Sequence, residues 1–491
     1  MTDALRSLDA VGDVLRSAGL LTETRGTGDV SVRGVSQDSR TVAAGDLFLA
    51  WKGTAHDGHD HVAEAASRGA VASVVERPLD LDLPQLVVSD GRRAGALAAA
   101  GVLGFPSEAL KAVGITGTNG KTTTALLVRE ILRTSMRTAV IGTLGLVDDD
   151  GVRPGTESLT TPGPVQLARS LRDLVDEGFE AVVLEASSHA LDQRRLDGTR
   201  FDVAVFTNLS QDHLDYHRDM EAYREAKVRL VHLVTPEGAV AVNRGEPAWD
   251  GLDPAGRRTI TYAVERPADI TASDLELGAD GSSFTLRVGA EQRSARLALP
   301  GRYNVENALA AAAAAHALGL GADAIVEGLG RASRVPGRLE VAWSGDFTVL
   351  IDFAHTPAAL DGMLRAVRPI TAGRLIVLFG AGGDRDRAKR RPMAEAVARH
   401  ADVIVLTSDN PRTEDPERIL DDLEEGLGVV PHERMADRAE AIRRAVALAH
   451  PGDTVVLAGK GHETYQVIGQ EKRPFDERVH VRGALDERGI A

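Results

Sequence analysis

Short apolar runs and amphipathic segments alternate along most of this 491-residue chain. In the middle of the chain, an apolar run over 112–115 precedes a segment over 124–133 in which Leu127 and Ile131 keep the i, i+4 spacing of a buried helix face. The runs that follow lie at 138–141, 181–184, 203–206 and 239–242, and the helical patterns between them include 165–177 and 220–233. This alternation predicts βαβ units and a largely parallel sheet.

Two further regions flank this central one. The first predicts a helix near 4–18 and strands near 30–35, 46–50 and 72–75, and the second predicts strands at 348–351, 375–379, 403–406 and 454–457. We therefore expect an α/β protein of three domains. They are a small mixed α/β domain over 1–108, a central parallel-sheet domain like that of phosphate-loop ATPases over 109–336, and a Rossmann-like domain over 337–491. A typical domain of about 150 residues gives the same number.

Composition narrows the class of protein. The net charge of −15 argues against a broad nucleic-acid surface, which is usually basic. The chain has no cysteine, which excludes disulfides, thiolate metal sites and cysteine nucleophiles. No apolar run reaches the roughly 18 residues that span a bilayer, and the first thirty residues lack the apolar core of a signal peptide. We expect a cytoplasmic monomer without membrane insertion or a nucleic-acid partner.

The most informative motif is the glycine-rich stretch over 114–123, Gly-Ile-Thr-Gly-Thr-Asn-Gly-Lys-Thr-Thr. A strand, a glycine loop ending in Gly-Lys-Thr and a helix together form the context of a phosphate-binding loop. Backbone N–H groups would hold phosphate, Lys121 would add charge, and Thr122 would offer a hydroxyl to Mg²⁺. Five residues separate Gly114 from Gly120, where the common form of the loop has four. The alternative is a structural turn with an accidental lysine, but the agreement of all parts favours a nucleoside triphosphate site.

Polar residues that follow the central strands point to a metal ion. Glu185 comes directly after the run at 181–184, and His213 follows the run at 203–206. Ligands of parallel sheets bind beyond the carboxyl ends of the strands, and a carboxylate and an imidazole suit Mg²⁺ beside phosphates. Either residue alone could be a helix cap or a buried polar group. Further on, Asn304 is either the N-cap of an alanine-rich helix predicted over 308–318 or, with Asn307, a contact to a nucleotide base.

In the C-terminal region, each apolar run ends in a loop rich in charged, polar and glycine residues, at 352–357, 380–386, 408–412 and 458–463. Four such loops at one sheet edge predict a second site. Arg385 stands where a dinucleotide fingerprint needs its last glycine, so we reject a nicotinamide cofactor. Arg385, Arg412 and Glu463 can together bind a zwitterion, with arginine on a carboxylate and glutamate on an ammonium. The alternative is a surface cluster of ion pairs.

With these residues assembled, the chain resembles the Mur ligases of peptidoglycan synthesis over nearly its whole length. The resemblance rests on the loop at 114–123, Glu-Ala-Ser-Ser-His at 185–189, Asn-Leu-Ser-Gln-Asp-His-Leu-Asp at 208–215 and Asp-Phe-Ala-His-Thr-Pro at 352–357. The Asp-Asn-Pro-Arg at 409–412 is typical of members that add diaminopimelate, since lysine-adding members replace its arginine. The resemblance implies an ATP-dependent ligase that adds diaminopimelate, meso by default, to the D-glutamate of UDP-N-acetylmuramoyl-L-alanyl-D-glutamate through an acyl phosphate.

The resemblance also implies roles for individual residues. Those expected to bind ATP are Gly117, Thr118, Asn119, Gly120, Lys121, Thr122, Thr123, Asn307, Arg338 and Asp352. Those expected to bind the UDP-muramoyl dipeptide are Ser39, Thr160, Thr161, Ser187, Gln193 and Arg195. Those expected to bind diaminopimelate are Arg385, Asp409, Asn410, Pro411, Arg412, Gly459 and Glu463. The expected Mg²⁺ ligands are Thr122, Glu185, His213 and a carbamylated Lys227, and catalysis is expected to depend on Lys121, Glu185, His213 and Lys227.

The chain departs from the family pattern at Gln37, at Thr54-Ala55-His56 and at Leu159. These positions concern the uridine and muramoyl contacts and leave the phosphate chemistry untouched. The lysine-adding ligase and folylpolyglutamate synthetase are alternatives within the superfamily, and Asp-Asn-Pro-Arg argues against both. A nucleotide-dependent switch ATPase is the alternative from another class, and it would have no need of the second site.

Overall fold

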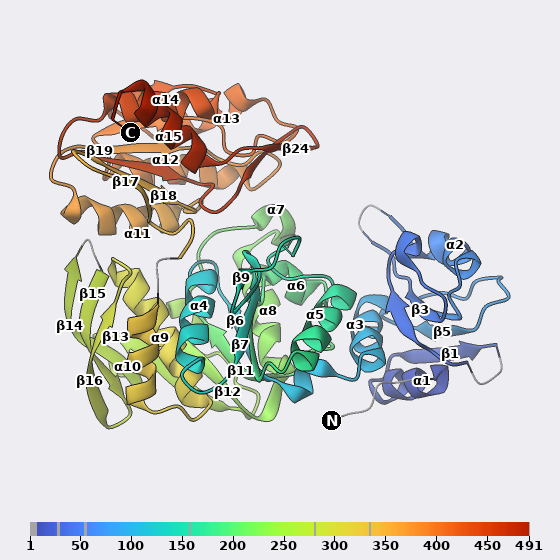
Figure 1. The fold of residues 1–491 in the computed structure, drawn as a ribbon. Coiled ribbons are helices and arrows are strands. Elements are labelled where there is room, and N and C mark those ends of the chain that lie inside the picture. Colours follow the sequence, from blue (N-terminus) through green and yellow to red (C-terminus); the bar gives the residue numbers. More distant parts are fainter. Residues whose placement is uncertain are drawn as a thin grey trace.

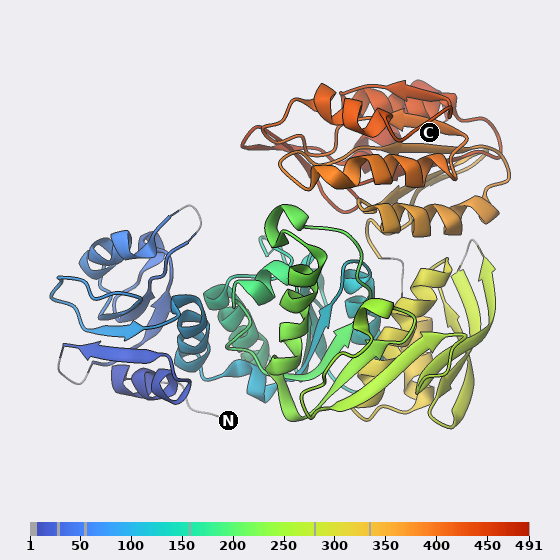
Figure 2. The same ribbon diagram turned by 180° about the vertical axis from the view of Figure 1, so that it is seen from behind.

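The computed structural model describes residues 7–26, 30–53, 56–156, 159–278, 281–332 and 335–490. Figure 1 shows three bodies: an N-terminal one in blue at one end, a central one from cyan to yellow, and a C-terminal one in orange and red. Seen from behind, the N- and C-terminal bodies contact different parts of the central one (Figure 2). The strands form one large sheet in each body and one small ribbon. The predicted α/β class is confirmed, and the domain limits at 108 and 336 stay predictions.

The N-terminal sheet has the order β1-β5-β4-β3-β2, with β1 antiparallel to β5. The predicted helix is shorter within the described residues and begins after Ser7, whose hydroxyl caps it. The predicted strand at 30–35 is also wrong in extent, because the strand there is Gly34–Ser36 and Ser31 forms only an isolated bridge with Ser7. The elements are α1 (Leu8–Ser17), β1 (Leu21–Arg25), β2 (Gly34–Ser36), β3 (Asp46–Leu49), α2 (Val62–Ser67), β4 (Ala72–Val75), β5 (Gln85–Val88) and α3 (Gly91–Val102).

The central sheet has eleven strands in the order β16-β15-β14-β13-β12-β11-β6-β10-β7-β8-β9. The run from β14 to β7 is parallel, as predicted, and antiparallel strands extend it at both edges. Its strands and larger helices are β6 (Lys111–Thr116), α4 (Lys121–Leu132), β7 (Thr138–Gly142), β8 (Gly145–Asp148), β9 (Gly151–Val152), α5 (Pro164–Asp176), β10 (Ala181–Glu185), α6 (Ser188–Asp192), β11 (Phe201–Phe206), α7 (Leu214–His217), α8 (Met220–Val228), β12 (Val234–Asn243), β13 (Arg258–Val264), β14 (Ile270–Gly278), β15 (Gly281–Val288), β16 (Glu291–Leu297), α9 (Arg302–Ala317) and α10 (Ala322–Arg331).

Helices cover both faces of this sheet, which explains why its parallel strands read as continuous apolar runs. In β6, Val113 and Ile115 pack into the core that α4, α9 and α10 share, whereas Ala112 faces the core on the opposite side. Helix α9 begins six residues before its predicted start, because Gly301 and not Asn304 is its N-cap. The prediction of Asn304 as the N-cap is therefore wrong. Asn304 lies in the first turn of α9 and donates from its own side chain to the Pro300 carbonyl at 2.8 Å.

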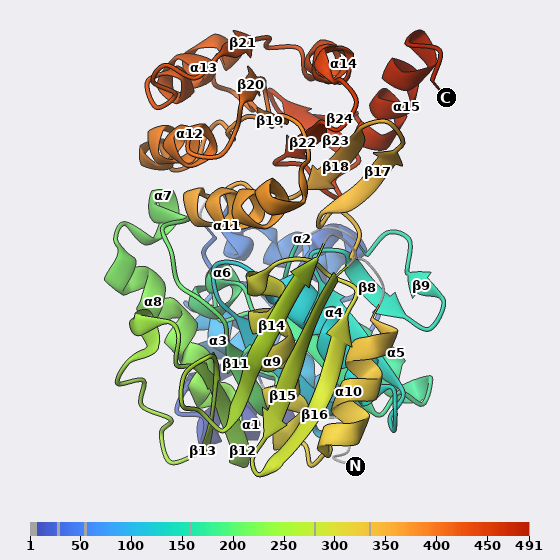
Figure 3. The same ribbon diagram turned by 90° about the vertical axis from the view of Figure 1, so that its left-hand side faces the viewer.

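The C-terminal sheet has the order β17-β18-β22-β19-β20-β21, and every strand except β17 runs parallel. The four loops singled out by their composition therefore do lie along one edge. Figures 1 and 3 place α11 on the side that faces the central domain. The elements are β17 (Glu340–Ser344), β18 (Thr348–Asp352), α11 (Pro357–Val367), β19 (Leu375–Phe379), α12 (Arg390–Ala398), β20 (Val403–Leu406), α13 (Pro416–Glu424), β21 (His432–Arg434), α14 (Arg438–Leu448), β22 (Thr454–Ala458), β23 (Tyr465–Ile468), β24 (Glu471–Pro474) and α15 (Glu477–Glu487).

Close packing of α10 against α4 gives a test of this architecture. A Cβ atom at Gly328 would lie 2.3 Å from the Ile131 Cα, so Gly328→Ala must push the two helix backbones apart. We expect a loss of about 1–3 kcal/mol of stability. Gly330→Ala in the same helix meets nothing within 4 Å, and we expect it to stabilise by about 0.5–1 kcal/mol. Thermal unfolding followed by circular dichroism measures both, and equal melting temperatures for the two variants would contradict the packing.

Candidate functional site

The loop between β6 and α4 approaches its neighbours too closely for side chains at two positions. A Cβ atom at Gly117, where φ is +147°, would lie 1.9 Å from Thr207 Oγ1. A Cβ atom at Gly120, where φ is +84°, would lie 2.3 Å from Asn307 Oδ1. Both conformations favour glycine, and both contacts require it. The loop backbone is therefore held directly against the end of β11 and the first turns of α9.

Two lysines converge on the same loop carbonyl. Lys121 Nζ donates to the carbonyls of Gly117 and Thr118 at 2.9 and 2.8 Å, and Lys227 Nζ donates to that of Gly117 at 2.8 Å. Lys227 is only 1% exposed and forms no ion pair with a carboxylate in the described part of the chain. Burial, and then the charge of Lys121, lower the pKa of Lys227 well below its usual value. Lys227 is thus a buried amine that loses its proton more readily than a surface lysine.

Two of the predicted metal ligands, Glu185 and His213, lie on either side of this loop. Strands β10 and β11 are the direct neighbours of β6, so Glu185, the last residue of β10, and His213, which follows β11, flank the loop. The buried Glu185 carboxylate accepts from Thr143 N at 2.9 Å and from Thr143 Oγ1 at 3.1 Å. Burial lowers the pKa of His213 to about 3, so its ring is neutral. Among the described residues, no three His, Asp or Glu side chains form a ready-made metal site.

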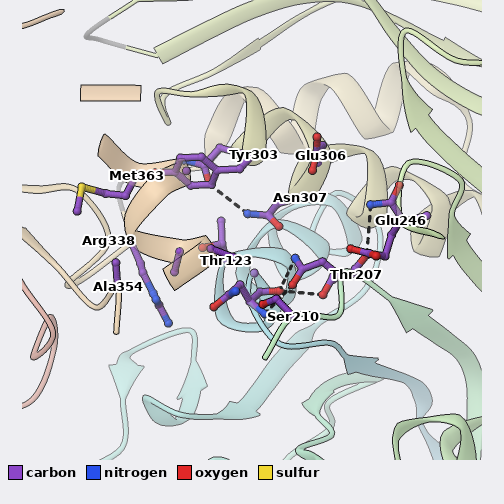
Figure 4. Close-up of a pocket in the computed structure, with 18 of the residues that line it drawn as sticks. Thr123, Thr207, Ser210, Glu246, Tyr303, Glu306, Asn307, Arg338, Ala354 and Met363 are labelled. Atoms are coloured by element: carbon purple, nitrogen blue, oxygen red, sulfur yellow. Dashed lines mark hydrogen bonds between the residues drawn. The ribbon is translucent and has the colours of Figure 1, made fainter. Parts of the chain in front are cut away.

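A cavity between the central and C-terminal domains opens beside the loop (Figure 4). It is lined by six of the residues predicted to bind ATP: Asn119, Gly120, Thr123, Asn307, Arg338 and Asp352. The Arg338 guanidinium stacks on Phe353 at 4.7 Å from the ring centre. The Asp352 carboxylate accepts from the backbone N–H groups of Leu339 and Ala354 at 2.7 and 2.8 Å. Glu246 and Tyr303 also line this cavity, and no motif in the sequence pointed to them.

The residues expected to hold the muramoyl dipeptide form one connected cluster in the central domain, apart from Ser39. Arg195 donates to the Thr161 carbonyl at 2.9 Å and to Gln193 Oε1 at 2.6 Å. Ser187 N donates to Thr161 Oγ1 at 3.1 Å. Thr160 joins the cluster to Glu185, because Thr143 Oγ1 lies 3.2 Å from the Thr160 hydroxyl and 3.1 Å from Glu185 Oε2.

Ser39 lies instead in a pocket of the N-terminal domain. Its hydroxyl donates to Glu64 at 2.8 Å, and Gln37, Arg40 and His56 line the same pocket. Of the positions that depart from the family pattern, Gln37 and His56 thus share this pocket. Leu159 is exposed, and Thr54 and Ala55 lie outside the described residues.

The residues expected to bind diaminopimelate meet at the carboxyl edge of the C-terminal sheet. Asn410 Nδ2 donates to Glu463 Oε2 at 3.0 Å, and Arg412 Nη1 donates to the Gly383 carbonyl at 2.8 Å. Burial, and then the nearby Arg385, lower the pKa of Arg412. Arg385 is exposed at the rim and donates to the Asp384 carbonyl.

Lys460 is the main residue of this edge that the sequence analysis missed. It is fully buried and donates to Asn410 Oδ1 at 3.1 Å and to Glu463 Oε2 at 2.9 Å. Its amine also lies 3.5 Å from Asp409 Oδ1. The position of Lys460 between two glycines directly after a strand was the available signal.

A buried ion pair joins the two domains next to His213. Lys389 Nζ donates to Asp212 Oδ1 at 3.0 Å, and both side chains are buried. His355 Nε2 lies 3.9 Å from the other oxygen of Asp212. Gln211 Nε2 also donates to Asp386 across this boundary at 3.0 Å. The C-terminal domain therefore holds the loop that carries His213, a contact that no local pattern reveals.

Comparisons with known proteins identify the family of this chain. Three family models match the chain: the catalytic domain of the Mur ligase family over 31–114, the Mur ligase middle domain over 115–315, and the glutamate ligase domain of Mur ligases over 337–461. The chain therefore belongs to the Mur ligase family. In the described residues, every helix is too short or too polar to cross a membrane.

Individual relatives cover nearly the whole chain. The UDP-N-acetylmuramoyl-L-alanyl-D-glutamate–2,6-diaminopimelate ligase of Geobacillus kaustophilus is 43% identical over 94% of this chain and 96% of its own. That of Synechococcus elongatus is 44% identical, with the same coverage. A solved structure of a ligase of this name is 33% identical, covers both chains fully and has a TM-score of 0.69. The MurF ligase of Thermotoga maritima in complex with ADP, 20% identical over 93% of this chain and 97% of its own with a TM-score of 0.66, shares the fold.

Proposed function

We propose that this protein is an ATP-dependent ligase that joins diaminopimelate to the D-glutamate of UDP-N-acetylmuramoyl-L-alanyl-D-glutamate. The observation that carries the proposal is the grouping of Asp409, Asn410 and Arg412 with Glu463 at a sheet edge beside the interdomain cavity. Relatives at 43% and 44% identity are named for this activity. Because ATP is a cytoplasmic substrate, we place the reaction in the cytoplasm. The expectation of a monomer stays a prediction.

The first step is phosphoryl transfer from ATP. The side-chain carboxylate of the D-glutamate attacks the γ-phosphorus, the bond to the β-phosphate oxygen breaks, and ADP leaves an acyl phosphate behind. The loop amides and Lys121 supply the positive charge that this transfer needs. Lys121 now donates to two neutral carbonyls, and exchanging them for phosphate oxygens gives stronger, charge-assisted hydrogen bonds. Thr161, Ser187, Gln193 and Arg195 hold the dipeptide next to Glu185.

The residues beside the loop fit a Mg²⁺ ion whose ligand set is completed by substrate. Glu185 would supply a carboxylate, Thr122 a hydroxyl and His213 a neutral imidazole, and phosphate oxygens would complete the ligand set. A metal ion held by these residues would supply positive charge against the charge that develops on the transferred phosphoryl group. Lys227 as a free amine would add no ligand of the right charge. The carbamate of Lys227 would add such a ligand. Only an unprotonated amine combines with CO₂, and Lys227 is buried, forms no ion pair within the described residues and has a lowered pKa, which favours that form.

The second step is attack by the diaminopimelate amine on the carbonyl carbon of the acyl phosphate. A tetrahedral intermediate forms, the amine loses its proton, and inorganic phosphate leaves as the amide bond is made. Arg412, with Arg385 at the rim, binds the carboxylate at the distal end of diaminopimelate, and Glu463 binds the ammonium beside it. Lysine lacks that distal carboxylate. No protein nucleophile takes part, which agrees with a chain that has no cysteine.

Phosphate release with each substrate omitted in turn tests the proposed function. We expect wild type to need ATP, the UDP-muramoyl dipeptide and diaminopimelate together, and to prefer diaminopimelate isomers over L-lysine. Arg412→Ala should lower kcat/KM for diaminopimelate about 10- to 100-fold, because a charged hydrogen-bond partner is lost, and should leave the rate with lysine nearly unchanged. Arg418→Ala, an exposed arginine of the neighbouring helix α13, is the matched control. Wild type that releases phosphate from ATP alone, or prefers lysine, would overturn the proposal.

Chemical rescue tests the carbamate at Lys227. Lys227→Ala should lower kcat at least about 100-fold, because it removes a metal ligand. Formate or acetate should restore part of the rate, since either anion can occupy the space of the carbamate. Methylammonium serves as the comparison, because it replaces the free amine. Rescue by methylammonium and not by the carboxylates would show that the unmodified lysine is the working form.

A further inference from the structure

A fully buried ion pair lies beneath the two loops that carry the proposed diaminopimelate site. Arg438 is the first residue of α14 and Glu477 the first residue of α15, and both side chains are 0% exposed. Arg438 Nη2 and Nε both donate to Glu477 Oε1, at 2.7 and 2.9 Å. The pair forms no part of the proposed chemistry, because other side chains bind each of the substrates.

The same guanidinium also bridges two strand ends that are not neighbours. Arg438 Nη1 donates to the Ser408 carbonyl at 3.1 Å, and Nη2 donates to the Ala458 carbonyl at 2.9 Å. These carbonyls directly precede Asp409 and Gly459, which begin the 409–412 and 459–463 loops. Strand β19 separates β20 from β22 in the sheet, so no ladder hydrogen bond fixes one loop relative to the other. Arg438 connects the backbones at the start of the two loops, in addition to the side-chain hydrogen bonds that Lys460 and Asn410 form between them.

Charges alternate from this pair up to the site. Glu477 contacts Arg438, whose charge acts on Asp409, and Asp409 lies 3.5 Å from Lys460, which in turn donates to Glu463. Burial alone would raise the pKa of Asp409, but Lys460 and then Arg438 outweigh it and lower that pKa. This series of alternating charges ends at Glu463, the carboxylate proposed to bind the ammonium group of the incoming amino acid.

Stability alone is a poor explanation for such a pair. A buried ion pair is often no more stabilising than well-packed apolar side chains of similar volume. An apolar pair, however, could not donate to the two carbonyls. Arg438 differs from an apolar residue in that it donates to backbone carbonyls at both strand ends, which indicates a role in positioning the loops that follow them.

We propose that Arg438, held by Glu477, is a positioning residue that fixes the spacing of the 409–412 and 459–463 loops. It thereby places Arg412 and Glu463 at the distance at which both can bind the amino-acid substrate. The inference rests on the proposed function, because it assumes that these loops bind diaminopimelate. The proposed sites for ATP and the dipeptide lie on the N-terminal and central domains and at the boundary with the C-terminal domain. A change in loop spacing should therefore act on one substrate only.

Steady-state kinetics of Arg438→Met, Arg438→Lys and Glu477→Gln test this role. We expect Arg438→Met to raise KM for diaminopimelate at least about tenfold, because small misplacements of binding groups are costly. KM for ATP and for the dipeptide should change less than about twofold. Arg438→Lys, which keeps the charge but cannot reach both carbonyls, should raise KM by an intermediate amount. The ratio of kcat/KM for diaminopimelate to kcat/KM for lysine should be highest in wild type, lower in Arg438→Lys and lowest in Arg438→Met.

Arg374→Met is the matched control. Arg374 lies at the opposite end of the same sheet, donates to the buried Asp453 at 2.7 Å and bonds to the Leu448 carbonyl at the far end of α14. It should lower the melting temperature without a selective effect on KM. The inference is overturned if all three KM values of Arg438→Met rise together, or if Arg374→Met raises KM for diaminopimelate equally. If Arg438→Met does not fold, Glu477→Gln is tested in its place. A selective rise in KM for diaminopimelate supports the inference, and a similar rise in all three KM values overturns it. A wild type that ligates no diaminopimelate contradicts the proposed function instead.

Discussion

The place of β6 between β10 and β11 is the constraint on which the site depends. Parallel strands end at the same edge of a sheet, so this order places the phosphate loop between Glu185 and His213. Two glycines then let the loop backbone lie against Thr207 and Asn307. A different strand order with the same sequence motifs would separate Lys121 from the predicted metal ligands Glu185 and His213.

An ion pair joins the C-terminal domain to the central domain. Lys389 reaches across the domain boundary to Asp212, the residue before His213, and both groups are buried. Breaking such a pair would leave an uncompensated charge, which is costly. The same contact brings the C-terminal loops toward the cavity beside the phosphate loop. Phosphoryl transfer and amine attack can therefore share one space, although their residues come from different sheets.

Apolar runs in the sequence predict those helices and strands whose limits depend only on the residues within them. The strands at 72–75, 375–379 and 403–406 have the predicted limits, because each is a short apolar run buried on both faces. The start of α9 was misplaced, since Gly301 begins the helix through a backbone conformation that the alanine-rich pattern does not encode. The antiparallel strands β15 and β16 were missed, because they carry alternating polar residues without a strong apolar run.

For the site, motifs identified the residue types and the structure supplied their partners. The proximity of Glu185, His213 and the loop follows from strand ends, which sequence can locate. Lys389 and Asp212 are 177 residues apart, and nothing near either one indicates the other. Lys460 and Arg438 are likewise defined by contacts to distant backbone and side chains. Sequence reasoning could name the residues predicted to bind phosphate, but not the contacts that hold the 409–412 and 459–463 loops in place.

The central claim is that the dipeptide carboxylate, and not water, attacks the γ-phosphorus of ATP. Transfer of an oxygen isotope tests it most directly. The D-glutamate side-chain carboxylate is labelled with heavy oxygen, and the phosphate released during ligation of diaminopimelate is analysed by mass spectrometry. The account predicts one labelled oxygen in each phosphate, with the other carboxylate oxygen kept in the new amide. Unlabelled phosphate from reactions that do form the amide would contradict it, because the oxygen lost from the carboxylate would then have left by another route.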